Sequence, residues 1–147
     1  MDLADLHRDR GFECVCGNLR MTARKVSSIY DRHLEPTGLL ASQLAVLWAV
    51  ASLAPAVVKK IAQTIAMDET ALLRNLRILE RRELVALRVG EDRRQRVVEL
   101  TAAGRRAFNQ ALPLWKEAQE QVRLALGNMT AVADLNHRLL ALTQALD

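Results

Sequence analysis

The chain has 147 residues, of which 50% are hydrophobic and 26% are charged. This length fits one composite domain and excludes a large multidomain enzyme, while the composition excludes wholesale disorder. Eight arginines and four acids lie between Arg74 and Arg96, so this segment accounts for the whole net charge of +4. Such a basic segment is typical of a site for a polyanion such as nucleic acid, although a solvated helix face has the same composition.

Several classes of protein are excluded by motifs that are missing. The N-terminal segment has no apolar signal peptide, and polar residues and prolines interrupt the longest uncharged stretch, so we expect a cytoplasmic protein with no membrane partner. Two cysteines cannot build a disulfide framework. Without a glycine-rich phosphate loop, an HExxH motif or a nucleophile elbow, we expect no enzyme, no catalytic residues and no cofactor. The histidines lack the spacing of metal ligands, so no metal site is expected.

The N-terminal third predicts two helices. From Phe12 to His33, apolar residues recur at alternating spacings of four and three, which predicts a long helix with a narrow apolar seam. The sequence 35–38, Glu-Pro-Thr-Gly, ends this helix. A second helix follows, with Ser42 as its expected N-cap, and Pro55 ends it.

The middle of the chain predicts a helix-turn-helix followed by a β-hairpin. Two short helical patterns lie between Val57 and Arg82, and Asp68 is placed to cap the second one. Strands are expected over 84–89 and 96–100, with a turn between them. A basic hairpin after a helix-turn-helix forms a wing, whose tip can reach a phosphate backbone or the minor groove.

The C-terminal part predicts two more helices with apolar seams. Thr101 is the expected N-cap of the first, Pro113 is expected to bend it, and Gly127 with Asn128 ends it. Thr130 is the expected cap of the last helix.

The fold class is therefore mainly α, with an α+β winged helix-turn-helix and a two-stranded β wing. One wing and one helix pair could hardly cover the seams of three terminal helices, so we expect a homodimer with intertwined terminal helices. We assign 1–35 and 101–147 to dimerisation and 36–100 to the winged helix-turn-helix region, all within one composite domain.

The segment 61–101 closely resembles the MarR family of winged helix-turn-helix transcription regulators. The family's wing signature is met by Asp92, Arg94, Leu100 and Thr101, and the order of helices agrees across nearly the whole chain. The resemblance implies an obligate dimer that binds a pseudo-palindromic operator in double-stranded DNA. It also implies a repressor that is released by a small aromatic or lipophilic effector or by cysteine oxidation.

By position, the resemblance implies that the helix starting near Asp68 enters the major groove while Arg94, held by Asp92, reaches the minor groove. Arginine can read guanine with two donors, so Arg74 is the best base-contact candidate and Arg77 a base or backbone candidate. Arg81 and Arg82, at the end of the helix, are interpreted as complementing its dipole and being solvated. The predicted DNA-binding residues are Thr70, Arg74, Asn75, Arg77, Arg88, Asp92, Arg93, Arg94 and Arg96.

The sequence also departs from the family pattern. Ala71 and Leu73 replace hydroxyl residues, and Glu69 in the first turn can repel phosphate. An architectural or protein-interaction dimer with weak, non-specific DNA binding is therefore the alternative. Glu83 stands where many relatives have glycine, so a left-handed conformation there would cost about 1 kcal/mol.

Two candidate sensors follow. Cys14 and Cys16 point to different sides of a helix, so they cannot share a disulfide or a metal without unwinding. Cys16, on the seam, is interpreted as a small core residue. Cys14 lies near the helix start and one turn after Arg10, both of which favour a thiolate. Its placement resembles that of the reactive cysteine in the peroxide-sensing branch of the family, but that branch supports the cysteine with several tyrosines and this chain has only Tyr30, so a structural Cys14 is the alternative.

The other candidate sensor is a pocket for a reversible effector, expected between the dimerisation helices and the DNA-reading region. Tyr30, His33, Trp48 and Trp115 are its predicted lining residues, although each can equally be part of an ordinary core or interface.

Overall fold

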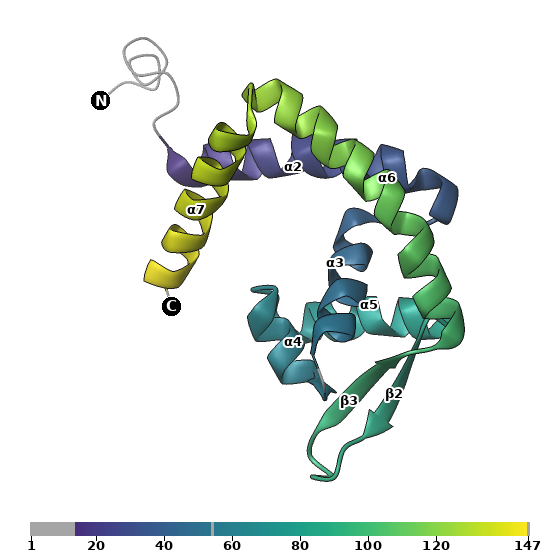
Figure 1. The fold of residues 1–147 in the computed structure, drawn as a ribbon. Helices are drawn as coiled ribbons and strands as arrows, with labels where there is room; N and C mark the ends of the chain where they lie inside the picture. The colour runs from purple at the N-terminus through teal and green to yellow at the C-terminus, as the bar shows by residue number, and fades with distance from the viewer. Residues whose placement is uncertain (1–13, 54, 147) are drawn as a thin grey trace, which may run out of the picture.

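The computed structural model describes residues 14–53 and 55–146. Its elements in chain order are α2 (Val15–Leu34), η1 (Glu35–Thr37), α3 (Ala41–Ser52), β1 (Ala56–Val57), α4 (Val58–Thr64), α5 (Glu69–Arg81), β2 (Val85–Val89), β3 (Arg96–Leu100), α6 (Ala102–Leu126) and α7 (Met129–Ala145). Helices α2 and α6 pack together at one end, α7 turns back from the end of α6, and the elements from α4 to β3 form a lobe at the other end (Figure 1). The mainly helical fold with a small sheet is confirmed.

The N-terminal helices differ from the prediction in how they begin. The N-cap of α2 is Cys14, whose sulfur accepts the Gly17 N–H at 3.3 Å. Phe12, where the seam was expected to start, lies outside the described residues. Ser42 is the wrong cap for α3, because the helix already begins at Ala41 after a Leu40 N-cap.

The first N–H groups of α3 instead find partners elsewhere. The Asp31 carboxylate in α2 accepts the Ala41 N–H at 2.7 Å, and the Gln43 side chain accepts the Leu40 N–H at 3.1 Å. The carboxylate comes from a residue ten positions earlier, so this contact cannot be predicted from the residues around the start of α3.

The lobe is built around one apolar core. Helix α5 contributes Leu72, Leu76 and Leu79, all fully buried and spaced by four and three residues. They pack with buried residues of the other elements, which include Leu47 of α3, Ile61 of α4, and Val85 and Val98 of the sheet. The predicted helix-turn-helix and hairpin are both confirmed, and this shared core fixes their relative positions.

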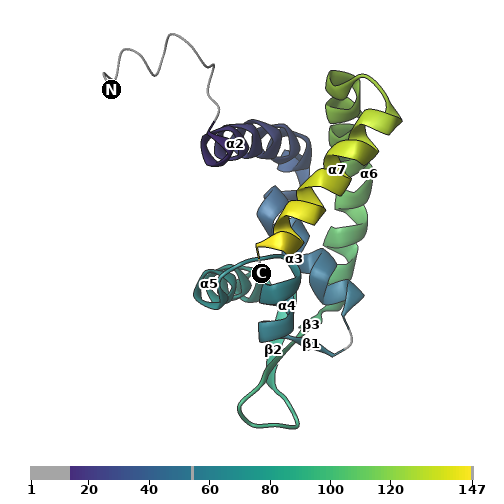
Figure 2. The same cartoon turned by 90° about the vertical axis from the view of Figure 1, so that its left-hand side faces the viewer.

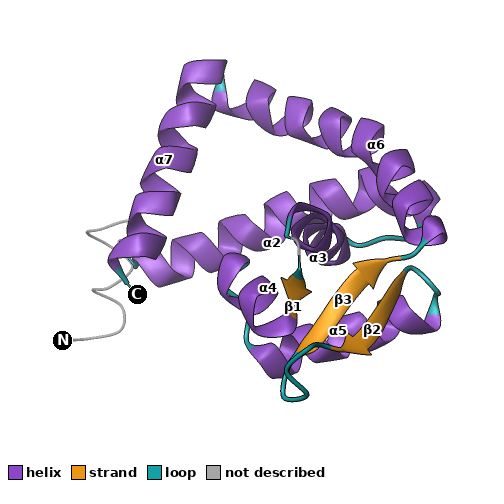
Figure 3. Cartoon of the chain, turned by 60° about the horizontal axis from the view of Figure 1, so that its bottom comes forward, coloured by secondary structure: helices purple, strands orange, loops and turns teal. Residues whose placement is uncertain are grey.

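The sheet has three strands in the order β1-β3-β2, all antiparallel (Figure 3). The predicted wing pair is confirmed, with Val85 opposite Leu100 and Val89 opposite Arg96. Strand β1 was not predicted: its two residues pair Ala56 with Val98 and Val57 with Val97. A strand of two residues carries no periodic signal, and only the neighbouring β3 defines it.

The junction between α5, the wing and α6 is tight. Glu83 has a φ of 57°, so the left-handed conformation considered from the sequence is present. Its carbonyl accepts the Thr101 hydroxyl at 2.6 Å, and the same hydroxyl oxygen accepts the Gly104 N–H at 2.9 Å. Thr101 is thereby confirmed as the N-cap of α6. A Cβ on Gly104 would lie 1.9 Å from the Leu84 carbonyl oxygen, so only glycine fits there.

The C-terminal part of the chain consists of two helices, α6 and α7. Helix α6 contains Pro113 and curves along its length, and it ends at Gly127 as predicted (Figure 1). The cap predicted for α7 is wrong: Asn128, not Thr130, accepts the Ala131 N–H at 2.9 Å.

Helix α7 folds back from the end of α6, as the turned view in Figure 2 shows. None of the residues of α7 is buried in the single chain. Its exposed large apolar residues are Met129, Leu135, Leu139, Leu140 and Leu142.

Candidate nucleic-acid interface and effector pocket

The N-terminus of α5 is capped by a local side chain. The Asp68 carboxylate accepts the N–H groups of Thr70 at 2.9 Å and of Ala71 at 3.1 Å, so the predicted N-cap is confirmed. These bonds satisfy two of the backbone donors that a helix leaves unpaired at its start. The beginning of α5, which carries the predicted base-reading residues, is therefore anchored.

The face of α5 opposite the core is polar. Thr70, Arg74 and Arg77 are all exposed. Their spacings of four and three place them on one side of the helix. The structure thus brings together three of the predicted DNA-binding residues on a surface that can enter a groove.

Asn75 lies differently. Its amide nitrogen donates to the Ala71 carbonyl at 3.2 Å and lies 3.9 Å from the Met67 sulfur, and the side chain is half-buried. These contacts turn its donors toward the preceding turn rather than toward solvent. Its predicted role in DNA binding stays a prediction.

The wing tip is a hydrogen-bonded turn. Gly90 N–H donates to the Gln95 carbonyl at 2.9 Å, and Gln95 N–H donates to the Asp92 carbonyl at 2.8 Å. The Asp92 carboxylate accepts the backbone N–H of Arg94 at 2.9 Å. Asp92 therefore orders the backbone of the tip and leaves the side chains of Arg93 and Arg94 exposed.

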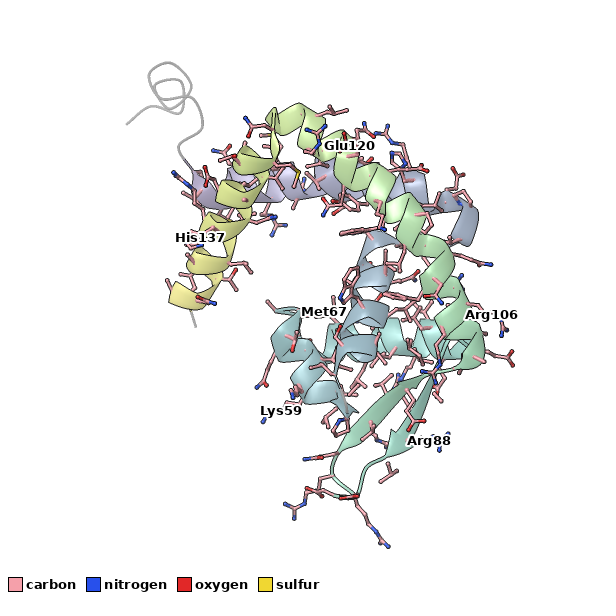
Figure 4. The ribbon with its side chains drawn as sticks, viewed as in Figure 1. Lys59, Met67, Arg88, Arg106, Glu120 and His137 are labelled. Carbon is pink, nitrogen blue, oxygen red and sulfur yellow. The ribbon has the colours of Figure 1, made fainter. Side chains whose placement is uncertain are left out.

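The strands of the wing carry the other two predicted arginines. Arg88 on β2 forms an ion pair with Glu99 on β3, with Nε and Oε2 3.2 Å apart, and both side chains are largely exposed. Figure 4 shows Arg88 on the wing, well away from the α2–α6 end of the molecule. Arg96 is exposed at the start of β3. The ion pair offsets the charge of Arg88, so the positive charge of the wing is concentrated at and beside its tip.

Two lysines that sequence reasoning missed lie next to this surface. Lys59 and Lys60 are exposed in the first turn of α4, the helix that precedes α5 in the chain and packs against it. Figure 4 shows Lys59 pointing away from the lobe. The first helix of a helix-turn-helix crosses the DNA backbone, where two cations would meet phosphate. The signal was an adjacent lysine pair at the start of that helix.

A pocket of about 620 Å³ opens among α2, α3, α4 and α6. Tyr30, Trp48 and Trp115 line it, as predicted. The Trp48 ring lies 5.4 Å from that of Trp115 and meets Phe108 edge-on at 5.7 Å. The other lining residues are Val26, Ser27, Ala41, Leu44, Ala45, Ala49, Ser52, Thr64 and Ile65. Among the described residues that line the pocket none carries a charge, and Ser, Thr and Tyr side chains bring hydroxyl groups to the wall.

Tyr30 joins the pocket to the α2–α6 contact. Its hydroxyl donates to the Gln119 side chain of α6, a bond that requires the protonated phenol. Partial burial raises the pKa of Tyr30 above its ordinary value. The phenol therefore stays neutral at physiological pH, and the pocket wall stays uncharged.

Comparisons with known proteins agree with this geometry. The family described as a winged helix DNA-binding domain matches residues 39–104. The transcriptional regulator MosR of M. tuberculosis, solved in complex with DNA, is 34% identical, with a TM-score of 0.81 over 91% of this chain and 98% of that one. A MarR-family regulator from Rhodococcus sp. RHA1 superposes with a TM-score of 0.80 at 22% identity, over 91% of this chain and 96% of that one.

The chain belongs to the MarR family of winged helix-turn-helix regulators. The HTH-type transcriptional regulator YwoH of Bacillus subtilis, itself uncharacterized, is 28% identical over 92 residues, which are 63% of this chain and 67% of that protein. The protein is a DNA-binding transcriptional regulator of the MarR type, and not an enzyme, because its relatives are regulators.

One predicted pocket residue lies elsewhere in this MarR-family fold. His33 is not part of the pocket wall: its Nε2 lies 3.0 Å from the Gln121 side chain and its Nδ1 lies 3.5 Å from the Glu117 carboxylate. The ring therefore lies between α2 and α6. The periodicity placed His33 on the correct face of α2, but one turn beyond Tyr30, where α6 covers it.

The cysteines are placed at the start of α2. Cys14 is exposed, as a sensor requires, and its expected neighbour Arg10 lies outside the described residues. The interpretation of Cys16 as a core residue is wrong for the single chain, because Cys16 is exposed as well. The apolar residues of α2 follow the predicted spacing, but no described element of the same chain covers the N-terminal end of this helix.

Within 14–53 and 55–146, no helix by itself has the length and hydropathy to cross a membrane. One pair, Val15–Thr37 with Ala41–Ser52, meets the criterion together but is bent by 75°.

Proposed function

We propose that this regulator is a cytoplasmic homodimeric repressor that binds a pseudo-palindromic operator and is released by an effector. The observation that carries the proposal is the exposed face of α5 with Arg74 and Arg77, next to a wing tipped by Arg94. Arginine suits both tasks, since its planar donors read guanine or hold phosphate. The relative MosR was solved in complex with DNA, which supports DNA binding by this chain.

The homodimer rests on apolar surface that the single chain leaves open. In α7, Leu140 is 63% exposed and Met129 is 65% exposed, and Leu124 at the end of α6 is 63% exposed. An apolar surface of this kind on two adjoining helices marks an interface. A second copy of the chain would cover it and would place two copies of α5 on adjacent half-sites.

The oligomeric state tests this part directly. Analytical ultracentrifugation is expected to show a dimer for the wild-type chain and a monomer for Leu140→Glu. Gln110→Glu, which adds the same charge to an exposed position in the first half of α6 and off the Leu140 face, is the control and is expected to remain dimeric. A wild-type monomer at micromolar concentration would refute the proposed dimer.

DNA binding is tested by fluorescence anisotropy with duplex DNA from upstream of the protein's own gene. The affinity should fall steeply with salt because phosphate contacts release counterions. Arg94→Ala should weaken binding to most duplexes and lower the salt slope by about 1, whereas Arg74→Ala should relax base preference at one operator position. Arg106→Ala is the charge-matched control, because Arg106 lies near the start of α6, at the opposite end of the wing from its tip (Figure 4).

The outcomes separate the two functions considered from the sequence. Equal binding to operator and scrambled duplexes would favour the architectural alternative. Unchanged affinity and salt slope in Arg94→Ala would refute the role of the wing.

The pocket supports an uncharged aromatic or lipophilic effector. Its volume is in the range of small-molecule sites. Trp48 and Trp115 offer ring surfaces, and the Tyr30 and Ser27 hydroxyls offer hydrogen bonds. A carboxylate buried here would meet no cation among the described residues of the pocket wall, and desolvating an unpaired charge is costly. A neutral ligand is therefore favoured over an anion of the same shape.

Two probes of matched shape test this preference. Trp48 and Trp115 are the only tryptophans of the chain, so quenching of their fluorescence reports the pocket. 1-Naphthol is expected to bind at least tenfold more tightly than 1-naphthoate, and Ala45→Phe is expected to abolish both signals by filling the pocket. Stronger binding of the naphthoate would refute the uncharged class of effector.

Oxidation is the second candidate signal, and the exposure of Cys14 favours it. The Cys14 sulfur is accessible and accepts the Gly17 N–H at the start of α2. Oxidation to a sulfenic acid would add a polar group at the N-cap of a helix that belongs to the proposed dimerisation region. Such a change can alter the spacing of the two DNA-reading lobes.

The redox signal is tested by repeating the DNA titration after mild peroxide treatment. Release of DNA by the wild type, lost in Cys14→Ser but kept in Cys16→Ser, would establish Cys14 as the sensor. Tight binding that is indifferent to peroxide would leave the pocket as the site of regulation.

A further inference from the structure

The turn that joins α2 to α3 is ordered by its own side chains. The Thr37 hydroxyl donates to the Leu34 carbonyl at 2.7 Å and accepts the Leu39 N–H at 3.2 Å. Gly38 follows with a left-handed φ of 65°, which favours glycine. This geometry points the carbonyl groups of Thr37 and Gly38 toward the end of α5.

Arg82, the C-cap residue of α5, binds both carbonyls. Its Nη1 donates to the Gly38 carbonyl oxygen at 2.8 Å, and its Nη2 lies 3.4 Å from the Thr37 carbonyl oxygen. A guanidinium is planar and always charged, so it can hold two carbonyls in a fixed geometry. We call this contact the Arg82 clamp. It joins the recognition helix to a turn 44 residues earlier.

The other side of the same turn reaches the pocket. Asp31 in α2 accepts the Ala41 N–H of α3 at 2.7 Å. Ala41 and Tyr30, the residue before Asp31, both line the pocket. A change in the spacing of α2 and α3 therefore acts on a turn that Arg82 connects to the end of α5.

We propose that Arg82 is a positioning residue, which fixes the orientation of α5 relative to α2 and so links the pocket to operator binding, rather than a DNA contact. Each terminal nitrogen of the exposed Arg82 side chain donates one hydrogen bond to a carbonyl of the turn, whereas Arg74 and Arg77 project from the opposite side of the buried leucines. The proposal rests on the proposed use of α5 in operator binding. It adds a structural contact to the interpretation of Arg82 as a solvated cation at the helix end, since the residue is exposed at the C-cap of α5.

The two possible roles predict different salt behaviour. A phosphate contact contributes one released counterion, so its loss lowers the salt slope by about 1. A positioning residue contributes none, so its loss weakens operator binding at every salt concentration by the same factor. Base contacts require α5 to be placed accurately in the groove. The affinity for the operator should therefore fall, while the affinity for a scrambled duplex should stay the same.

The experiment compares full-length wild type with Arg82→Ala, Arg82→Lys and Arg81→Ala in anisotropy titrations across a salt series. Arg82→Ala is expected to bind the operator about tenfold more weakly, the effect of losing hydrogen bonds from a charged donor, with an unchanged slope. Arg82→Lys keeps one donor for the Gly38 carbonyl and should recover part of the affinity. Arg81, exposed in the last turn of α5 and outside the clamp, lies on the same face as Arg74 and Arg77. It is the comparison for a cation lost from the DNA-facing side, so Arg81→Ala is expected to lower the salt slope instead.

A double-mutant cycle measured by urea unfolding tests the contact itself. A Cβ added at Gly38 would lie 3.2 Å from Nη2 of Arg82. Gly38→Ala should therefore cost less stability in the Arg82→Ala background than in the wild type. Additive effects would overturn the clamp as an energetic contact.

Each failure has a distinct signature. A salt slope lowered by about 1 in Arg82→Ala would show a phosphate contact and overturn the positioning role. Wild-type affinity in Arg82→Ala would overturn it as well, while leaving operator binding intact. Lack of salt-sensitive DNA binding by the wild type would refute the proposed function, and the role of Arg82 in operator binding with it.

Discussion

Replacing Gly104 by alanine should strongly destabilise the protein, because α6 begins against the backbone of the wing. The added Cβ would lie 1.9 Å from the carbonyl oxygen and 2.9 Å from the carbonyl carbon of Leu84. Backbone atoms cannot rotate away, so the start of α6 must move by at least about 1 Å. This shift would stretch the bonds from Thr101 to the Leu84 and Glu83 carbonyls, which are 3.2 and 2.6 Å long.

The expected loss follows from these contacts. Overpacking costs about 1–3 kcal/mol, and each weakened hydrogen bond costs about 1 kcal/mol, so Gly104→Ala should lose about 3–5 kcal/mol of unfolding free energy. That is a large part of the roughly 5–15 kcal/mol that stabilises a typical protein. DNA binding should weaken too, because the same junction holds the wing against α6.

Urea unfolding at one fixed protein concentration measures this loss, since the proposed dimer makes stability depend on concentration. Gly90→Ala is the matched control: its Cβ would meet the Val97 side chain at 3.2 Å, and a side chain can move. We expect the control to lose less than about 1 kcal/mol. An equally small loss in Gly104→Ala would refute the argument from the close backbone approach.

Three further changes have defined outcomes. Glu83→Gly should raise the unfolding free energy by about 1 kcal/mol, measured by urea unfolding, because the residue is left-handed. Asp68→Ala should lower it by about 1 kcal/mol and weaken operator binding, as it removes the N-cap of α5. Burial raises the pKa of Tyr30 in the folded state above the ordinary value of 10.0. The neutral phenol therefore contributes its full stability below pH 10.0, and this contribution is lost as the pH rises through the raised pKa. A pH series of unfolding curves should therefore show a smaller alkaline loss for Tyr30→Phe than for the wild type.

The order and type of the main elements follow from local sequence. The leucine spacing of α5, the Asp68 and Thr101 caps and the alternating strands of the wing are each determined within a few residues. The resemblance to the MarR family, through its wing signature, made Asp92 and Arg94 candidates, and the chemistry of arginine made Arg74 and Arg77 of α5 candidates. Glu83 could be identified as unusual because glycine is the residue that tolerates its conformation best.

What the tertiary structure decided depends on residues far apart in the chain. Strand β1 exists only because β3 lies beside it, and α3 begins at Ala41 because Asp31 of α2 accepts its N–H. His33 contacts α6 and not the pocket, whereas Trp48 and Trp115 lie together in the pocket wall. Arg82 binds the carbonyl group of a residue 44 positions earlier in the chain. Periodicity reports which side of a helix is apolar, but only the packed chain decides which neighbour covers that side, since packing depends on all the elements at once. Helix α7 shows the same limit, because its leucines follow a clear pattern and the single chain leaves them uncovered.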